Sequence, residues 1–339
     1  MNRASFLKIF IPAVSISVLA FVLLIYLSLA TVAPVLYPIR IDSAYVSLKN
    51  QELITQTYND TVIDPIQLLY HPSQMNVSVA DVICKTSDGN VLNGWYYNKP
   101  KNPSGTAILM IHNLGDSKIS LMESCRLFND YGFYVFCFDM PAHGNSTGDI
   151  FSMENRTIQS LKTVVDTIFC NQEIENLAVI GTGFNSYLAA RIALEIKPQA
   201  LILNDPVNSV DEYLQKITEN RWGGLSVLVN PFIIRLYEFK TGVRTDSLIL
   251  SSLIKKSMVP LMIAVTSNSV LQNEVGDAVK VFRESSSPVK KIWTDKAKGF
   301  ITNTNDEEKN YYRAVSAFIN SNIPKKEITK RKRKSIVEL

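Results

Sequence analysis

Short, densely apolar runs alternate with segments of helical period through the middle of the chain, and this alternation constrains the fold more than any other feature. Residues 107–112 and 134–139 are the clearest runs, because each is nearly all apolar and too short for an ordinary helix. A strand buried on both faces produces such a run, since neither face then carries polar side chains. The pattern predicts an α/β fold, a mostly parallel twisted sheet with helices on both faces. Further strands are expected at 177–180, 200–203, 260–265 and 289–294, and helices at 120–131, 152–170, 186–196, 271–283 and 307–319.

Two segments depart from this rhythm. Residues 76–98 are rich in β-forming residues and are broken at 87–89, which predicts a hairpin. Residues 208–258 separate two expected strands by a long interval, and we interpret them as an inserted cap. The cap contains an apolar run, 225–239, that could cover a pocket or face a bilayer or a partner.

The N-terminal segment predicts a membrane anchor. No charged residue occurs between residues 9 and 39, and residues 6–30 are densely apolar. A membrane-spanning helix needs about 20 such residues, whereas a cleaved signal peptide has an apolar region of about 7–15. We therefore expect an uncleaved, single-pass anchor at 9–33, with the lipid bilayer as its partner. Arg3 and Lys8 precede it, so the positive-inside rule favours a cytoplasmic N-terminus and an extracytoplasmic domain.

Composition limits the class of protein. The chain has 339 residues, of which 46% are hydrophobic and 19% charged, which suits one large globular domain or two small ones rather than a polytopic membrane protein. Four widely spaced cysteines form no Cys-x-x-Cys pair, which argues against a zinc module and a disulfide-rich miniprotein. The last 15 residues hold seven Lys or Arg against two Glu. We interpret them as a solvated tail, with contact to anionic lipid headgroups as the alternative; they are too short and aromatic-free to indicate nucleic-acid binding.

These observations together predict the organisation of the chain. The expected boundaries are 1–8 for an N-terminal flank, 9–33 for the anchor, 34–75 for a juxtamembrane connector, 76–324 for the α/β domain with its cap at 208–258, and 325–339 for the basic tail.

Three sequence elements resemble the α/β-hydrolase family, especially membrane-anchored members similar to serine aminopeptidases and monoacylglycerol lipases. They are the hairpin with Asp-Gly at 88–89 and Gly-Trp at 94–95, the segment ILMIHNLGDSK at 108–118, and the segment YGFYVFCFDMPAHGNSTGD at 131–149. The resemblance covers roughly residues 78–323. It implies the α/β-hydrolase fold with an inserted cap, and it directs attention to the loops at the carboxyl ends of the strands.

The same resemblance indicates that the catalytic triad is missing. The family carries its nucleophile in a G-x-S-x-G turn between a strand and a helix. The matching segment, VIGTGFNSYLAA at 179–190, has Gly183 where the serine belongs. The position of the acid matches Ser269, and that of the base matches Gly299 or Lys298. In this family the base follows the nucleophile along the chain, yet no histidine follows His143, so no shift of the alignment restores it.

The loop after the first parallel strand also departs from the family. His112, Asn113, Leu114 and Gly115 match the oxyanion loop, with Asn113 where the family has glycine. A displaced dyad of Ser186 activated by His112 is conceivable. The alternative is that Ser186 lies in the first turn of its helix and that His112 packs structurally, and we favour it because such dyads are rare.

Other polar residues near these loops carry no specific signature. His143 and Asp139 are expected to brace the loop in which they lie. With His112 and Asp116 they could be metal ligands, but nothing in their spacing makes three of them converge. No P-loop occurs, and the Gly-x-Gly at 181–183 lacks the third glycine of a dinucleotide-binding turn. We therefore expect neither a metal nor a cofactor.

Two classes of function follow. The first is a membrane-anchored, non-catalytic binding or scaffold protein, a pseudo-hydrolase. The alternative is a serine hydrolase of lipid esters or peptide amides with a displaced catalytic set. A subunit of a larger membrane complex, with a protein partner, is a third hypothesis. The absence of a late histidine favours the first, because loss of a triad member lowers the rate by orders of magnitude.

Overall fold

The computed structural model describes residues 3–38, 78–87, 89–98, 100, 102–153, 155–266, 274–295 and 306–324. Eight strands form one sheet in the order β1-β2-β4-β3-β5-β6-β7-β8. The strands are β1 (Val79–Lys85), β2 (Val91–Tyr97), β3 (Thr106–Ile111), β4 (Tyr134–Phe138), β5 (Asn176–Thr182), β6 (Ala200–Asn204), β7 (Leu261–Thr266) and β8 (Lys290–Asp295).

The sheet is antiparallel at one edge and parallel elsewhere. The predicted hairpin is present as β1 and β2, and β2 also pairs antiparallel with β4. From β4 to β8 every pair is parallel. All residues of β3, β4 and β6 are buried, as expected of strands covered on both faces.

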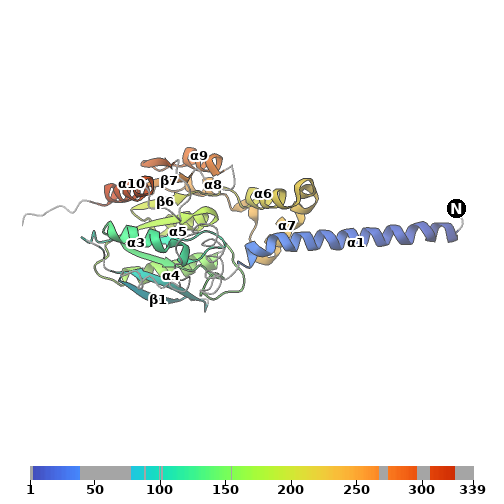
Figure 1. Ribbon diagram of the computed structural model, residues 1–339, viewed down its shortest axis with the longest axis horizontal. Helices are drawn as coiled ribbons and strands as arrows, with labels where there is room; N and C mark the ends of the chain where they lie inside the picture. The colour runs from blue at the N-terminus through green and yellow to red at the C-terminus, as the bar shows by residue number, and fades with distance from the viewer. Residues whose placement is uncertain are drawn as a thin grey trace, which may run out of the picture.

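Helices cover both faces of the sheet (Figure 1), as the alternating pattern predicted. Successive strand side chains point to opposite faces, so Leu109 and Met110 of β3 belong to different cores. The core with Leu109 includes α4, α5, α8 and α9, whereas that with Met110 includes α3 and α10. The bounds of these helices are α3 (Met122–Asp130), α4 (Asn155–Phe169), α5 (Ser186–Ile196), α8 (Leu250–Ile254), α9 (Glu274–Glu284) and α10 (Asp306–Asn322).

Helices also fill the long interval between β6 and β7. These are α6 (Val210–Trp222), α7 (Ser226–Thr241) and the short α8, with single 3-10 turns at Gly223–Leu225 and Thr245–Ser247. Ser209 begins α6 by accepting a hydrogen bond from the backbone N–H of Glu212, which satisfies a free donor of the first turn. Gly242 ends α7 in the left-handed conformation.

The N-terminal helix α1 (Arg3–Leu36) extends away from the sheet, and its last turns lie beside α6 and α7 (Figure 1). Its segment Val14–Leu36 is long and apolar enough to cross a membrane. The helix continues three residues past the expected end of the anchor at residue 33. Val35 and Leu36 are buried in the core that includes α5 and α6, so packing on the domain holds this last turn.

Candidate functional site

The strand β5 ends in a tight turn that leads directly into α5. Gly183–Asn185 form a single 3-10 turn between them. Gly183 has φ +56°, in the left-handed region that glycine adopts without strain. A strained turn of this kind exposes the nucleophile in enzymes with the G-x-S-x-G motif. The chain therefore retains the turn, with a residue that has no side chain at its apex.

The side chain of Asn113 fills the space that a residue larger than glycine would need at position 183. A Cβ atom built on Gly183 would lie 2.3 Å from Asn113 Oδ1 and 2.5 Å from its Cγ, far inside contact distance. The glycine at 183 and the asparagine at 113 are thus sterically complementary.

Asn113 Oδ1 also accepts the hydrogen bonds that would stabilise an oxyanion. The backbone N–H of Phe184 donates to it at 2.9 Å and that of Leu114 at 2.8 Å. In enzymes with this turn, the oxyanion hole consists of the N–H after the nucleophile and an N–H from the loop after the first parallel strand. Here both donors are already bonded to a side-chain amide oxygen of the same chain.

The two nearby histidines are held in fixed, neutral states. The Nδ1–H of His112 donates to the carbonyl of Asn113 at 2.7 Å, and its Nε2 accepts from the N–H of Met140 at 3.0 Å. His143 is bonded in the same way, through Nδ1 to Pro141 and through Nε2 to the N–H of Gly115. Burial lowers the pKa of His112, and burial together with the neighbouring His112 lowers the pKa of His143 to about 3. Neither ring has a nitrogen left to accept a proton from a nucleophile.

Ser186, the alternative nucleophile, lies in the first turn of α5 and is fully buried. Its hydroxyl donates to the carbonyl of Gly181 at 3.4 Å. The ring nitrogens of His112 have the partners given above, so the structure does not bring this pair together as a hydrogen-bonded dyad. This geometry favours the structural interpretation of both residues.

Asp139 braces the loop after β4. Its carboxylate forms a buried ion pair with Lys118 and accepts from the backbone N–H groups of Lys118 at 2.7 Å and Asn145 at 3.0 Å. Gly144, at φ +46°, makes room for it, because a Cβ there would lie 2.3 Å from Asp139 Oδ2. This carboxylate is committed to holding backbone, which leaves it no role as a catalytic acid.

The end of α1 and the helix α6 lie against the site. The ring of Phe184, directly after the glycine of the turn, lies 4.7 Å from that of Tyr213 on α6. The carbonyl of Leu36, the last residue of α1, accepts from the N–H of Phe151 at 2.9 Å. Phe151 in turn packs edge-on against His143, with ring centroids 5.0 Å apart. The helix α1 is therefore linked through Phe151 and His143 to the loop of Asn113 and Gly115.

Ser269 and Gly299, the expected positions of the acid and the base, lie outside the described residues, as does the basic tail at 325–339. Among the residues that are described, no group of three or more His, Cys, Asp or Glu side chains is placed to hold a metal ion.

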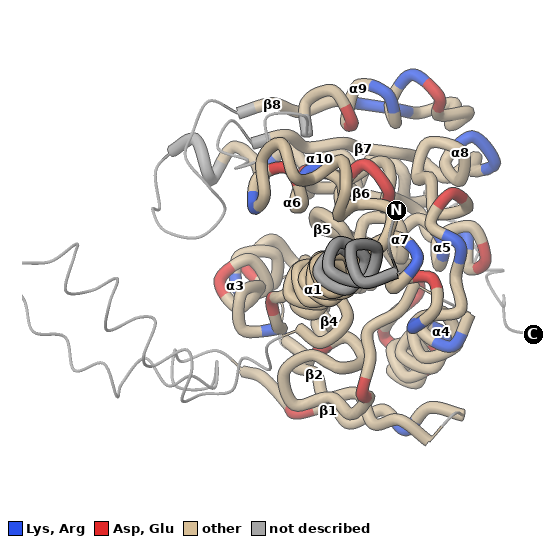
Figure 2. Tube along the Cα trace, turned by 90° about the vertical axis from the view of Figure 1, so that its right-hand side faces the viewer, with Lys and Arg blue, Asp and Glu red and all other residues tan. Residues whose placement is uncertain are grey.

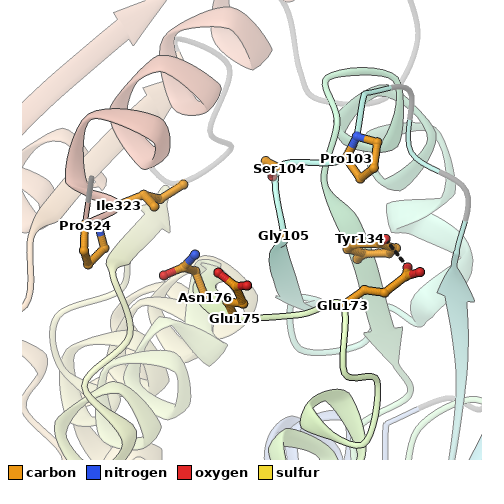
Figure 3. Close-up of a pocket in the computed structure, with 9 residues that line it drawn as sticks. All are labelled: Pro103, Ser104, Gly105, Tyr134, Glu173, Glu175, Asn176, Ile323 and Pro324. Carbon is orange, nitrogen blue, oxygen red and sulfur yellow. Dashed lines mark hydrogen bonds between the residues drawn. The ribbon is translucent and has the colours of Figure 1, made fainter. Parts of the chain in front are cut away.

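A cavity of about 440 Å³ lies at the amino ends of the parallel strands, opposite the ends that carry the turn at Gly183 (Figure 3). It is lined at the amino ends of β3, β4 and β5 by Gly105, Tyr134 and Asn176, and by Pro324 after α10. Tyr134 donates to Glu173 at 2.5 Å, and burial, with that carboxylate beside it, raises its pKa to about 12. In parallel sheets ligands bind at the carboxyl ends of the strands, so this cavity is not where a hydrolase site is expected.

Sequence reasoning located the turn and the oxyanion loop but missed their contact. It identified Gly183 and Asn113 separately, each as a departure from the family pattern. The two departures have opposite effects on size: position 183 has glycine where the family has serine, and position 113 has asparagine where the family has glycine. This opposite change in size is the signal that could have predicted a contact between the two residues. The partners of Phe184 and Leu114 depend on atomic positions that a sequence pattern does not contain.

No family model matches the chain. Uncharacterized proteins from two strains of Mycobacterium tuberculosis are 24% identical to it over 156 residues, which is 43% of this chain and 55% of theirs. The chain thus matches about half the length of these curated relatives.

Solved structures resemble most of the domain. The Pyrococcus furiosus esterase Pf2001 is 19% identical with a TM-score of 0.57, over 74% of this chain and 94% of that one. The α/β hydrolase GrgF from Penicillium sp. is 18% identical with a TM-score of 0.54, over 73% and 99%. The monoacylglycerol lipase of Paleococcus ferrophilus is 16% identical with a TM-score of 0.50, over 68% and 99%. Similarity at this level shows the fold alone, and it confirms the predicted fold class.

Proposed function

We propose that this chain, which has the α/β-hydrolase fold, is a membrane-anchored binding or scaffold protein that does not hydrolyse substrates. The observation that carries the proposal is the position of the Asn113 carboxamide. It occupies the space of a nucleophile's side chain beside Gly183 and accepts from both oxyanion donors. At this turn, which the structure describes in full, a substrate carbonyl therefore finds neither an attacking side chain at position 183 nor a free N–H of Leu114 or Phe184.

The proton-transfer machinery supports the same conclusion. A general base must accept a proton from the nucleophile, and it does so best with a pKa near the working pH. His112 and His143 are buried, have lowered pKa values and use both ring nitrogens in structural hydrogen bonds. The sequence holds no histidine after residue 143 that could replace them.

The fold remains available for binding. The anchor helix α1 packs on α6 and α7, so the domain is held close to the membrane that α1 enters. A protein partner in the same membrane is the kind of ligand this arrangement suits, since α6 and the end of α1 lie against the former catalytic site.

Ester turnover tests the proposal. The full-length chain in detergent micelles is assayed with p-nitrophenyl esters of increasing acyl length, with the active esterase Pf2001 as the positive control. We expect no turnover above the rate with the Ser186→Ala variant, at every chain length. Turnover that the Ser186→Ala substitution abolishes would establish the alternative, a serine hydrolase with a displaced nucleophile, and would overturn the proposal.

A further inference from the structure

One face of α7 and the turn before it expose large apolar side chains. Leu225 is 54% exposed, Val227 78%, Leu228 58% and Phe232 38%. We call these four side chains the α7 apolar face. Residues 225–234 contain no charged residue. Contiguous apolar surface of this kind marks an interaction site in a soluble domain.

The α7 apolar face lies beside the membrane-crossing helix. The rings of Phe232 on α7 and Phe21 on α1 meet edge-to-face, with centroids 6.4 Å apart. The exposed side of α1 at this level is also apolar, with Phe21 and Val22 both more than half exposed. The two exposed surfaces are therefore continuous across neighbouring helices.

The depth of this contact follows from where α1 leaves the domain. Burial against the protein begins at Leu27 and Ser28, whereas residues 14–23 are exposed. A bilayer crossing takes about 20 helical residues. If α1 spans a bilayer, the roughly 20 residues before Leu27, where burial against the domain begins, form the crossing, and Phe21 is one of them. Phe232, in contact with Phe21, then lies at the same depth.

We propose that the α7 apolar face is immersed in the leaflet nearer the domain. The chain then contacts the bilayer with two helices: α1 spans it, and α7 lies in its surface. This inference rests on the membrane anchoring in the proposed function. A shallow amphipathic helix buries its apolar face at the boundary between headgroups and acyl chains. Seen along α1 from its N-terminal end, charged residues lie on outer helices such as α3, α4, α8 and α9, and also on α6 and beside α7 (Figure 2). The charges of α7 begin at Arg235, after the α7 apolar face.

The last two residues of α6, Arg221 and Trp222, are of the types found at a membrane interface. The indole N–H of Trp222 donates to Thr31 Oγ1 at 2.7 Å, and Arg221 donates to the carbonyl of Ala30 at 2.8 Å. Trp and Arg are favoured where the apolar layer meets water, since each combines an apolar body with a polar end. These two bonds fix the turn between α6 and α7 to α1 at the level where α1 becomes buried.

Depth-dependent quenching tests the inference. Full-length chain is prepared with Cys170, the exposed cysteine among the described ones, replaced by serine, and with one new cysteine carrying an NBD fluorophore. The sites are Val227→Cys on the α7 apolar face, Val18→Cys on α1 and Val275→Cys on α9, which are 78%, 57% and 55% exposed. Each protein is reconstituted into phosphatidylcholine vesicles with or without doxyl-labelled phosphatidylcholine. Leu228→Cys serves as a second reporter in case one substitution impairs folding.

The expected result is loss of NBD emission in doxyl vesicles at Val18 and Val227, with no loss at Val275. Loss at Val18 without loss at Val227 or Leu228 overturns the inference and leaves the anchor intact, whether water or a second copy of the chain covers the face. No loss at Val18 refutes the membrane anchoring in the proposed function, and the inference fails with it.

Discussion

At the scale of single residues, the contact between positions 113 and 183 determines what the site can do. Alanine at 183 adds a Cβ that clashes with Asn113 and places an L-residue at φ +56°. We expect Gly183→Ala to lower the free energy of unfolding by about 2–4 kcal/mol, from backbone strain and overpacking together. Denaturant titration of the full-length chain in micelles measures this loss.

A double-mutant cycle separates the two causes. Asn113→Gly removes the clash but leaves the backbone strain, so Gly183→Ala should cost less in that background. Equal costs in both backgrounds would show that the Asn113 side chain does not occupy the position described here.

The buried histidines make stability depend on pH. His143 has a pKa of about 3 in the folded chain and near 6.5 when unfolded, so between these values the unfolded state binds a proton that the folded state does not. Its stabilising contribution is present above pH 6.5 and is lost as the pH falls toward 3. Below pH 6.5 each such group contributes a slope approaching about 1.4 kcal/mol per pH unit.

The His143→Gln variant isolates this contribution. Free energies of unfolding at pH 7, 6 and 5 should fall with pH in the unmodified chain, and less steeply in the variant. Burial also lowers the pKa of His112, so His112 contributes to the slope that remains in the variant. An unchanged slope in the variant, or stability that rises as the pH falls, contradicts the assignment of a neutral, buried His143.

At the scale of elements, the end of α1 belongs to the folded domain as well as to the segment that is apolar enough to cross a membrane. Val32, Val35 and Leu36 are each at most 3% exposed, and Thr31 and Leu36 accept hydrogen bonds from Trp222 and Phe151. A chain that starts at residue 41 loses these buried side chains and both hydrogen bonds, whereas a chain that starts at residue 24 keeps them.

We expect the chain that starts at residue 41 to have a melting temperature lower by on the order of 10 °C, because it loses this apolar burial.

Two substitutions in the chain that starts at residue 24 provide a matched control. Leu36→Ala should lower the melting temperature because it empties a buried site, whereas Leu29→Ala, at a side chain 44% exposed, should change it little. Equal melting temperatures for all these proteins would mean that α1 is only a tether.

At the scale of the whole molecule, the sequence predicted the sheet well. Strands buried on both faces, such as β3 and β4, produce apolar runs that periodicity detects. The predicted helix at 186–196 matches α5 to the residue, while α3 begins at Met122, two residues later than the 120 expected. Helix ends shift because caps and local packing, rather than hydrophobic period, determine them.

Two features were beyond sequence reasoning for a physical reason. An apolar helical run looks the same whether lipid or protein covers it, so the packing of Leu27 and Leu36 on the domain could not be read from composition. The occupation of the oxyanion donors by Asn113 depends on one side-chain conformation between two loops. The triad positions Ser269 and Gly299 remain predictions.

The proposed function requires that the chain holds no activated serine. A fluorophosphonate probe forms a covalent adduct with an activated serine, so the intact mass of the protein in detergent micelles after incubation with the probe decides the question. We predict an unchanged mass, with a catalytically active hydrolase of the same fold fully modified in parallel. A stoichiometric adduct that maps to Ser186, or to any other serine of the domain, would show that the chain is a serine hydrolase.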